Sequence, residues 1–102
     1  MVVIVSKDEI LKKLQKIKSK YTEEGFYIVG LFGSYARDEQ DEFSDIDIAY
    51  KIDYDSFSKK YKDGFSKLLR IEDIKNELEE LLSAKVDLVP YSDKKFKDLI
   101  NV

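Results

Sequence analysis

One segment of the sequence, residues 45–52, predicts a strand whose two faces differ in chemistry. Its apolar side chains fall on every second position: Ile46, Ile48, Tyr50 and Ile52. Side chains alternate between the two faces of a strand, so Asp45 and Asp47 would share the opposite face. Aspartate disfavours strands, and two carboxylates on one face repel each other unless something cationic offsets the repulsion. The segment therefore predicts a sheet that is covered on its apolar face and open to a ligand on its acidic face.

The residues before this segment predict a helix, a strand and a turn. Ser6 and Glu9 have the spacing of a capping box, which predicts a helix that begins there and ends at Gly25. Its apolar positions repeat at helical spacing: Ile10, Leu11, Leu14, Ile17 and Tyr21. Residues 26–32 are aromatic and β-branched, which predicts a buried strand ending at Gly33. We expect residues 34–40 to form a short helical turn.

The residues after this segment predict two more helices and one more strand. The apolar spacing over residues 71–82 predicts a helix, and residues 84–90 predict a strand that ends at Pro90, the one proline of the chain. Four aromatic or apolar residues also have helical spacing: Phe57, Tyr61, Phe65 and Leu68. They lie on both sides of Gly64, so this part is either irregular or a broken helix. Ser92 is expected to cap a last short helix that buries Phe96, Leu99 and Ile100.

The order of these elements favours an α+β (two-layer α/β) fold with a small mixed β-sheet and helices on one face. We expect a single domain over residues 1–102. The helices would cover the face that carries Ile46 and Ile48. The face that carries the aspartates would then remain available to a ligand.

Composition excludes several kinds of catalysis. The chain has no histidine and no cysteine, which excludes Ser-His-Asp and Cys-His catalysis, disulfides and zinc-thiolate sites. Carboxylate, lysine, arginine, tyrosine and hydroxyl groups remain, and a hard metal ion is their natural helper. The net charge of -3 gives no reason to expect direct nucleic-acid binding. No apolar run approaches the roughly 20 residues of a membrane span and no secretory signal is evident, so we expect a cytoplasmic protein with no membrane association.

The segment GSYARDEQDEFSDIDI, residues 33–48, resembles the signature of the DNA polymerase β-like nucleotidyltransferase superfamily. It is most similar to the minimal nucleotidyltransferase (MNT) family, many of whose members are paired with HEPN-domain proteins. The family pattern is Gly-Ser, ten residues, then Asp-x-Asp, and this chain matches it with Gly33, Ser34, Asp45 and Asp47. One departure is Asp38, where family members commonly have glycine. The resemblance implies the nucleotidyltransferase fold over nearly the whole chain.

The resemblance also implies a Mg²⁺ site and ATP as the nucleotide substrate. Asp45 and Asp47 would coordinate one or two Mg²⁺ ions during transfer of a nucleoside monophosphate, most plausibly AMP from ATP. The family has a third carboxylate on a later strand, and Asp87 fits that position. Judged by its surroundings alone, Asp87 is either a hydrogen-bonded structural residue or a metal ligand. If its strand lies beside that of the other two aspartates, Asp87 becomes a ligand and the best candidate base.

Three residues of the turn are expected to bind the triphosphate. Gly33 would let the backbone approach a phosphate closely, and the Ser34 hydroxyl would donate a hydrogen bond to it. Arg37 either adds positive charge at the triphosphate or forms a surface ion pair with Glu39 or Asp41.

Two further residues have roles that the sequence leaves open. Ser44 either orients Asp45 or terminates the loop, and Tyr35 either lines the nucleotide pocket or packs on the core.

The MNT resemblance implies that the chain modifies a hydroxyl, most plausibly of tyrosine, on a HEPN toxin and so acts as an antitoxin. Either a partner protein or a second subunit would present the acceptor, so a homo-oligomer is also compatible with the sequence. A competing hypothesis is a non-catalytic module that neutralises its partner by contact alone. A template-independent polymerase or tRNA-modifying enzyme is disfavoured, because the sequence shows neither a basic surface nor a nucleic-acid-binding domain.

Overall fold

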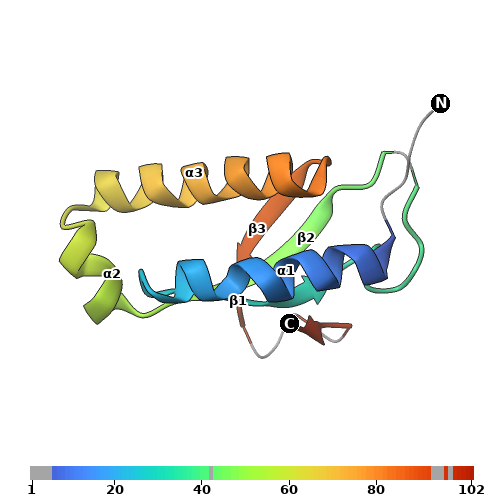
Figure 1. Cartoon of the computed structure of the whole chain (residues 1–102), viewed down its shortest axis with the longest axis horizontal. Coiled ribbons are helices and arrows are strands. Elements are labelled where there is room, and N and C mark those ends of the chain that lie inside the picture. Colours follow the sequence, from blue (N-terminus) through green and yellow to red (C-terminus); the bar gives the residue numbers. More distant parts are fainter. Residues whose placement is uncertain (1–5, 42, 93–95, 97) are drawn as a thin grey trace.

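The computed structural model describes residues 6–41, 43–92, 96 and 98–102, which form a four-stranded sheet and three helices (Figure 1). In chain order the elements are α1 (Lys7–Thr22), β1 (Phe26–Phe32), β2 (Ile46–Ile52), α2 (Tyr54–Lys60), α3 (Gly64–Leu82), β3 (Val86–Pro90) and β4 (Ile100–Asn101). The strand order is β3-β2-β1-β4. Strands β2 and β3 are parallel and the other pairs are antiparallel, so the sheet is mixed, as expected.

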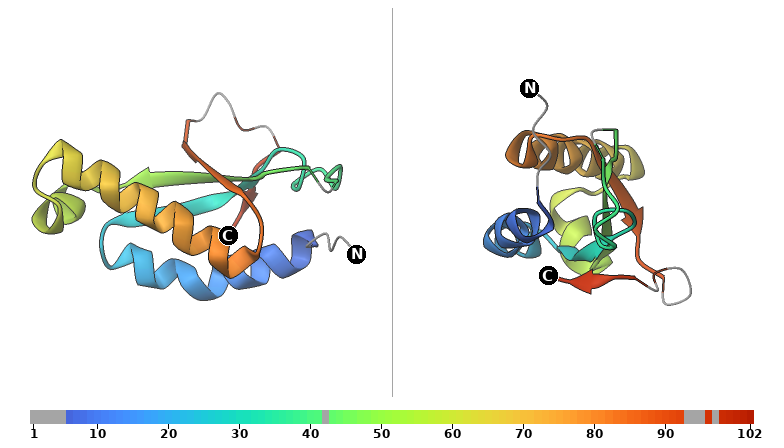
Figure 2. Two further views of the ribbon diagram at one scale, coloured as in Figure 1. Left: turned by 90° about the horizontal axis from the view of Figure 1, so that it is seen from above. Right: turned by 90° about the vertical axis from the view of Figure 1, so that its right-hand side faces the viewer.

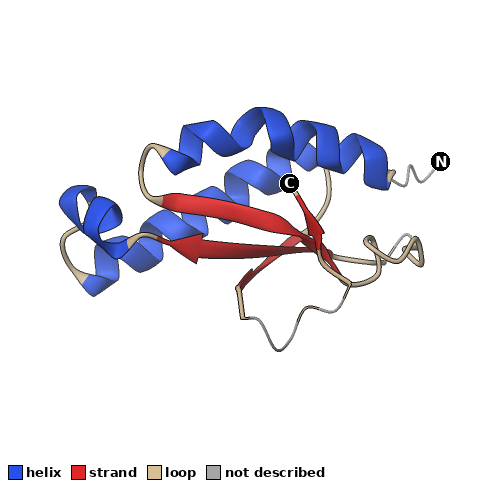
Figure 3. Ribbon diagram, turned by 90° about the horizontal axis from the view of Figure 1, so that it is seen from below, coloured by secondary structure: helices blue, strands red, loops and turns tan. Residues whose placement is uncertain are grey.

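Helices α1 and α3 pack on the same face of this sheet. The end-on view in Figure 2 separates them from the strands, and in Figure 3, seen from below, the strands cross in front of α3 while α1 runs along their upper side. Fully buried side chains join the two layers: Ile10 and Leu14 of α1, Ile46 and Ile48 of β2, and Ile74, Leu78 and Leu82 of α3. The face that carries Ile46 and Ile48 is therefore the covered face, which confirms the two-layer expectation.

The first half of the fold follows the local sequence signals closely. The Ser6 hydroxyl accepts a hydrogen bond from the Glu9 backbone N–H at 3.2 Å, so the predicted cap begins α1. The chain then reverses at Gly25, whose φ of 91° few other residues adopt. A Cβ atom at Gly25 would also lie 2.8 Å from the Phe57 backbone nitrogen. Strand β1 has the predicted bounds, and β2 begins one residue later than predicted.

The apolar residues on both sides of Gly64 belong to a broken helix, which was one of the two alternatives. The break lies between α2 and α3, where the Asp63 carboxylate accepts a hydrogen bond from the Ser66 N–H at 2.7 Å and caps α3. Helix α3 thus begins at Gly64 rather than near Ile71. No helix in the described part of the chain is long and apolar enough to cross a membrane.

The predicted C-terminal helix is wrong where it can be compared. Ile100 lies in β4, opposite Leu31 of β1, and the Val102 N–H donates to the Val29 carbonyl at 3.1 Å. The free edge of β1 offers these backbone groups hydrogen bonds that no local signal near Ile100 reveals. Gly30 makes the approach possible, since a Cβ atom there would lie 2.2 Å from the Ile100 carbonyl oxygen. Residues 93–95 and 97 of the predicted helix lie outside the described residues.

Candidate active site

Two aspartates lie side by side where β2 and β3 begin. The parallel pairing of these strands places Asp47 opposite Asp87 in register. Asp47 alternates with the buried Ile46 and Ile48, so its carboxylate projects from the face that α1 and α3 leave uncovered. Asp45 lies one residue before the start of β2. The strand of Asp87 is therefore the neighbour of the Asp47 strand, which was the condition for Asp87 to join the site.

Gly33 lies directly against Asp47. It follows Phe32, which pairs with Asp47 across β1 and β2, and it has a φ of 76°. A Cβ atom at Gly33 would lie 2.2 Å from Asp47 Oδ2, a contact far shorter than van der Waals separation. Both the backbone conformation and the available space therefore require glycine at the start of the turn. The Gly-Ser pair and the second aspartate of the motif, separated in the sequence, are neighbours in the fold.

The turn after Gly33 is a single helix-like turn, as expected. The Arg37 N–H donates to the Gly33 carbonyl at 3.2 Å, and the Glu39 N–H donates to the Ser34 carbonyl at 2.8 Å. Asp38 ends the turn with a φ of 57°, in the left-handed region. This conformation suits glycine, the residue that the family resemblance implies at this position, and aspartate is one of the few other residues that tolerate it.

The Asp38 side chain also anchors the turn to α1. Its Oδ2 atom accepts a hydrogen bond from Lys7 Nζ at 2.8 Å, which raises the pKa of Lys7. The departure at Asp38 is therefore accommodated by the local backbone and by an ion pair.

The acidic face has an excess of negative charge. Burial raises the pKa of Asp47, and the nearby carboxylates of Asp87 and Asp45 raise it further, while Arg37 opposes them. None of the ion pairs among the described residues includes any of these three aspartates. A bound cation would offset this repulsion.

The donor set fits Mg²⁺, which prefers carboxylate oxygens. Among the described residues, no three carboxylates converge closely enough to hold a metal ion by themselves. Mg²⁺ commonly needs only one or two protein carboxylates, because water and substrate phosphates complete its coordination. The pair Asp47 and Asp87, with Asp45 close by, therefore suits an ion that arrives with a triphosphate.

Arg37 lies near the aspartates but is engaged elsewhere. Its Nε donates to Glu39 at 3.0 Å and its Nη1 donates to Asp98 at 3.4 Å. The ion pair with Glu39 was one of the expected alternatives, whereas the partner Asp98 was not anticipated. No local signal identifies Asp98, because it approaches Arg37 only after the C-terminal segment returns to the sheet.

Two alternatives left open by the sequence are now resolved. The Ser44 hydroxyl accepts from the Asp41 N–H at 3.0 Å and donates to the Asp41 carboxylate at 3.2 Å, so it terminates the loop rather than orienting Asp45. Tyr35 is only 3% exposed and packs in the core. Burial, followed by the charges of Asp41 and Asp45, raises the pKa of Tyr35.

This fold and this arrangement of aspartates define a class of protein. The chain superposes on a solved structure described as that of a putative minimal nucleotidyltransferase, with a TM-score of 0.67 over 95% of this chain and 96% of the other. The two sequences are 23% identical, so the match shows a shared fold, namely the fold expected from the sequence.

The chain belongs to the nucleotidyltransferase domain family, whose model matches residues 8–102. Three proteins of Methanocaldococcus jannaschii, each named a putative protein adenylyltransferase, are similar to it over 103 aligned residues. They are 42%, 41% and 41% identical to this chain, and each match covers 92% of both sequences. The expected enzyme class, a nucleotidyltransferase, is thereby confirmed.

Proposed function

We propose that this domain, taken as residues 1–102, transfers AMP from ATP to a hydroxyl group of a partner protein in a Mg²⁺-dependent reaction. The observation that carries the proposal is the placement of Asp47 beside Asp87, with Gly33 packed against Asp47. The names of the similar proteins from M. jannaschii support AMP as the transferred group and a protein as the acceptor.

Asp45, Asp47 and Asp87 would hold one or two Mg²⁺ ions, together with phosphate oxygens of ATP. The bound Mg²⁺ would neutralise charge on the triphosphate and lower the pKa of the attacking hydroxyl. The burial of Asp47 strengthens its interaction with any cation, since charges interact more strongly where water is partly excluded.

The proposed reaction is an in-line displacement at the α-phosphorus of ATP. The acceptor oxygen forms a bond to that phosphorus, the bond to the bridging oxygen of the β-phosphate breaks, and pyrophosphate leaves. The exposed carboxylate of Asp87 would accept the proton of the hydroxyl. The described residues include no histidine, because the sequence has none, so a carboxylate is the natural base.

The turn would bind the leaving part of ATP. The backbone N–H groups that follow Gly33 would face the phosphates, and the Ser34 hydroxyl, which is partly exposed, would donate to a β- or γ-phosphate oxygen. Arg37 would add positive charge at this end of the site, near enough to lower the pKa of Asp47. Its pairs with Glu39 and Asp98 are exposed and therefore weak enough to exchange for a phosphate.

We further propose that the acceptor is a HEPN-domain toxin modified on a tyrosine hydroxyl, so that this chain serves as its antitoxin. The support is the resemblance of residues 33–48 to the MNT family, many of whose members are paired with HEPN proteins. The competing hypothesis of a non-catalytic antitoxin drew its support from the departure at Asp38, whose left-handed backbone aspartate tolerates.

The test is label transfer in a mixture of the purified chain, the candidate partner, Mg²⁺ and labelled ATP. We expect label on the partner with the wild-type chain and with Asp73→Ala, which removes an exposed aspartate in the middle of α3 and outside the site. Asp45→Ala and Asp47→Ala should each abolish it. Label that persists with both variants would contradict the mechanism. Protection of cells by Asp45→Ala would instead show that contact alone neutralises the partner.

A further inference from the structure

A groove of about 600 Å³ lies at the end of β2 and β3 that is remote from the aspartates. It is formed where β2 and β3 end and the first turns of α3 pass over them, and its lining includes Tyr50, Lys51, Tyr54, Lys67, Leu68 and Tyr91. Tyr50 shares the covered face of β2 with Ile48 and stacks on Phe26 at 5.0 Å. Asp47 lies three residues earlier on β2, about 10 Å away along the strand and on the opposite face.

Exposed apolar side chains lie in the lining of this groove and next to it in the sequence of α3. Among the described residues, six large hydrophobic side chains are exposed, and four of them lie at this end of the molecule: Tyr54 (66%), Phe65 (71%), Leu68 (68%) and Leu69 (52%). Phe65, Leu68 and Leu69 are spaced as neighbours on one face of α3. Contiguous exposed apolar surface beside a groove is typical of a protein-binding site.

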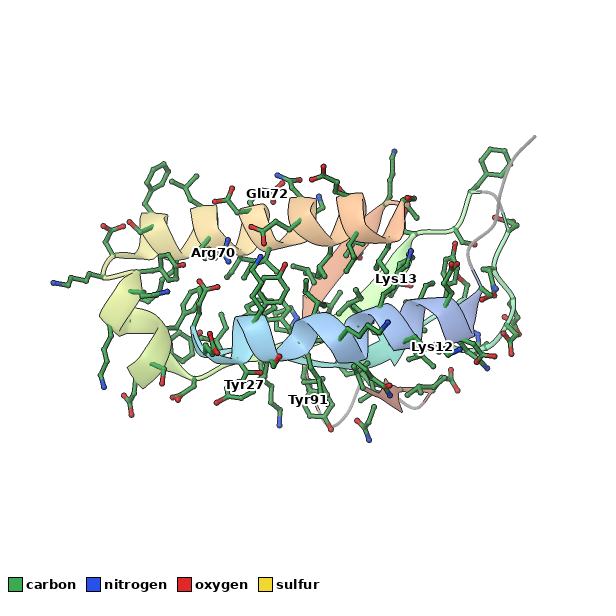
Figure 4. The ribbon with its side chains drawn as sticks, in the orientation of Figure 1. Lys12, Lys13, Tyr27, Arg70, Glu72 and Tyr91 are labelled. Carbon is green, nitrogen blue, oxygen red and sulfur yellow. The ribbon has the colours of Figure 1, made fainter. Side chains whose placement is uncertain are left out.

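The charged lining of the groove is entirely basic, although the chain has 21 acidic and 18 basic residues. Lys51 Nζ lies 4.5 Å from the centroid of the Tyr91 ring, which Figure 4 labels. Lys67 Nζ donates to the Lys62 carbonyl at 3.3 Å. Neither lysine takes part in the ion pairs of the described residues. The groove is therefore complementary to an apolar side chain that is flanked by carboxylates.

We propose that this groove docks an acidic amphipathic segment of the acceptor protein, while a different part of the acceptor presents the hydroxyl to the aspartates. The inference rests on the proposed function, since it assumes a protein acceptor. Strand β3 is an edge of the sheet and contributes both Asp87 and the groove residue Pro90. A protein that lies along this edge reaches the aspartates and the groove at once.

The test compares transfer of AMP label to acceptor protein in an extract of the source cells. The groove variant is Lys67→Glu combined with Leu68→Ser, and Lys67→Arg is the charge-conserving variant. The matched control, Lys16→Glu combined with Phe43→Ser, changes an exposed lysine and an exposed phenylalanine elsewhere. All of these side chains are at least partly exposed, so each variant should remain folded.

We expect the groove variant to label the acceptor at least ten-fold more slowly at limiting acceptor concentration. Lys67→Arg and the matched control should label at the wild-type rate, and calorimetry should show unchanged binding of Mg²⁺ and ATP by all variants. Equal labelling by the groove variant and wild type would overturn the docking proposal and leave the proposed function intact. It would also be overturned if sedimentation showed a wild-type dimer that the groove variant loses, because a second copy would then occupy the groove. Absence of labelling by the wild-type chain would instead refute the proposed function.

Discussion

Gly33 and Asp47 constrain each other more tightly than any other pair of residues near the site. The close approach of Asp47 Oδ2 to the position of a Cβ atom on Gly33 leaves no room for a methyl group, and the φ of 76° disfavours one. The geometry of the turn and the position of the carboxylate are therefore coupled.

Gly33→Ala should accordingly destabilise the fold and reduce AMP transfer together. We expect a loss of about 1–3 kcal/mol in the free energy of unfolding, because the methyl group must displace Asp47 and the backbone is strained. Urea unfolding and label transfer measure the two effects. Gly64→Ala is the matched control for stability, since a Cβ atom there meets nothing within 4 Å, and it should leave the free energy of unfolding unchanged or slightly improved. An equal effect of both substitutions would show that Asp47 does not depend on Gly33.

Asp47→Asn should make the protein more stable and less active. Asp47 is partly buried among the carboxylates of Asp87 and Asp45, which repel its charge. Removing that charge while keeping the shape should raise the midpoint of thermal unfolding, measured without metal, by a few degrees, since about 1 kcal/mol corresponds to roughly 4–8 °C for a domain of this size. Label transfer should be lost in the same variant. A lowered midpoint would contradict the account of Asp47 as an uncompensated charge.

At the scale of elements, a buried ionic network joins α3 to the end of α1. Arg70 points from α3 into the space between the two helices (Figure 4). It donates to both carboxylate oxygens of Glu24, at 2.9 and 2.7 Å, and to Glu77 at 2.8 Å. Glu24 is only 7% exposed and also accepts a hydrogen bond from the Tyr61 hydroxyl. This network therefore links the residues that follow α1 and α2 to α3.

Arg70→Met should destabilise the fold by about 3–5 kcal/mol, because it leaves Glu24 charged and buried without its partner. Chemical unfolding at neutral pH measures this loss. The double variant Glu24→Gln, Arg70→Met should recover much of it, since no uncompensated charge then remains. A double variant no more stable than Arg70→Met would show that the network acts through packing rather than charge.

The same network predicts how stability depends on pH. Hydrogen bonds from Arg70 hold the pKa of Glu24 below its usual value of 4.5. A depressed pKa in the folded state gives stability that is complete above the unfolded pKa and is lost as pH falls through the folded pKa. The wild type should therefore lose stability on acidification below about pH 4.5 more steeply than Glu24→Gln, measured by unfolding across that range. Parallel curves would contradict this assignment.

The elements that the sequence predicts well are those set by local signals. The cap at Ser6, the strand β1 and residues 71–82 of α3 depend on residues within a few positions of each other. Strand β4 depends instead on the free edge of β1 and on the absence of a side chain at Gly30, about 70 residues away. No periodicity near Ile100 carries that information, which is why a helix was predicted there.

At the scale of the whole molecule, the site also combines residues that local sequence identifies with residues that only the fold brings together. Gly33 and Asp47 can be found from a single stretch of sequence, because their spacing matches a family pattern. Asp87 joins them only through the parallel pairing of β2 and β3, which the sequence does not state. The ion pair between Arg37 and Asp98 can be identified only when the position of Asp98 in the fold is known. The sequence could therefore name Asp87 only on the condition of that pairing, and it gave no indication of Asp98.

The molecule as a whole has the aspartates and the groove at opposite ends of one pair of strands. Strands β2 and β3 begin at the aspartates and end at the groove. In our proposal the aspartates serve the nucleotide half of the reaction, and the acceptor protein brings its hydroxyl to them while it is bound at the groove.

The central claim, nucleotidyl transfer at the acidic face, is tested most directly by the position of the label in ATP. The purified chain, its acceptor and Mg²⁺ are incubated with ATP labelled at the α-phosphate or, in parallel, at the γ-phosphate. Our account predicts that α-label becomes covalently attached to the acceptor, while γ-label leaves as pyrophosphate. Attachment of γ-label instead would show phosphoryl transfer, and would contradict the account.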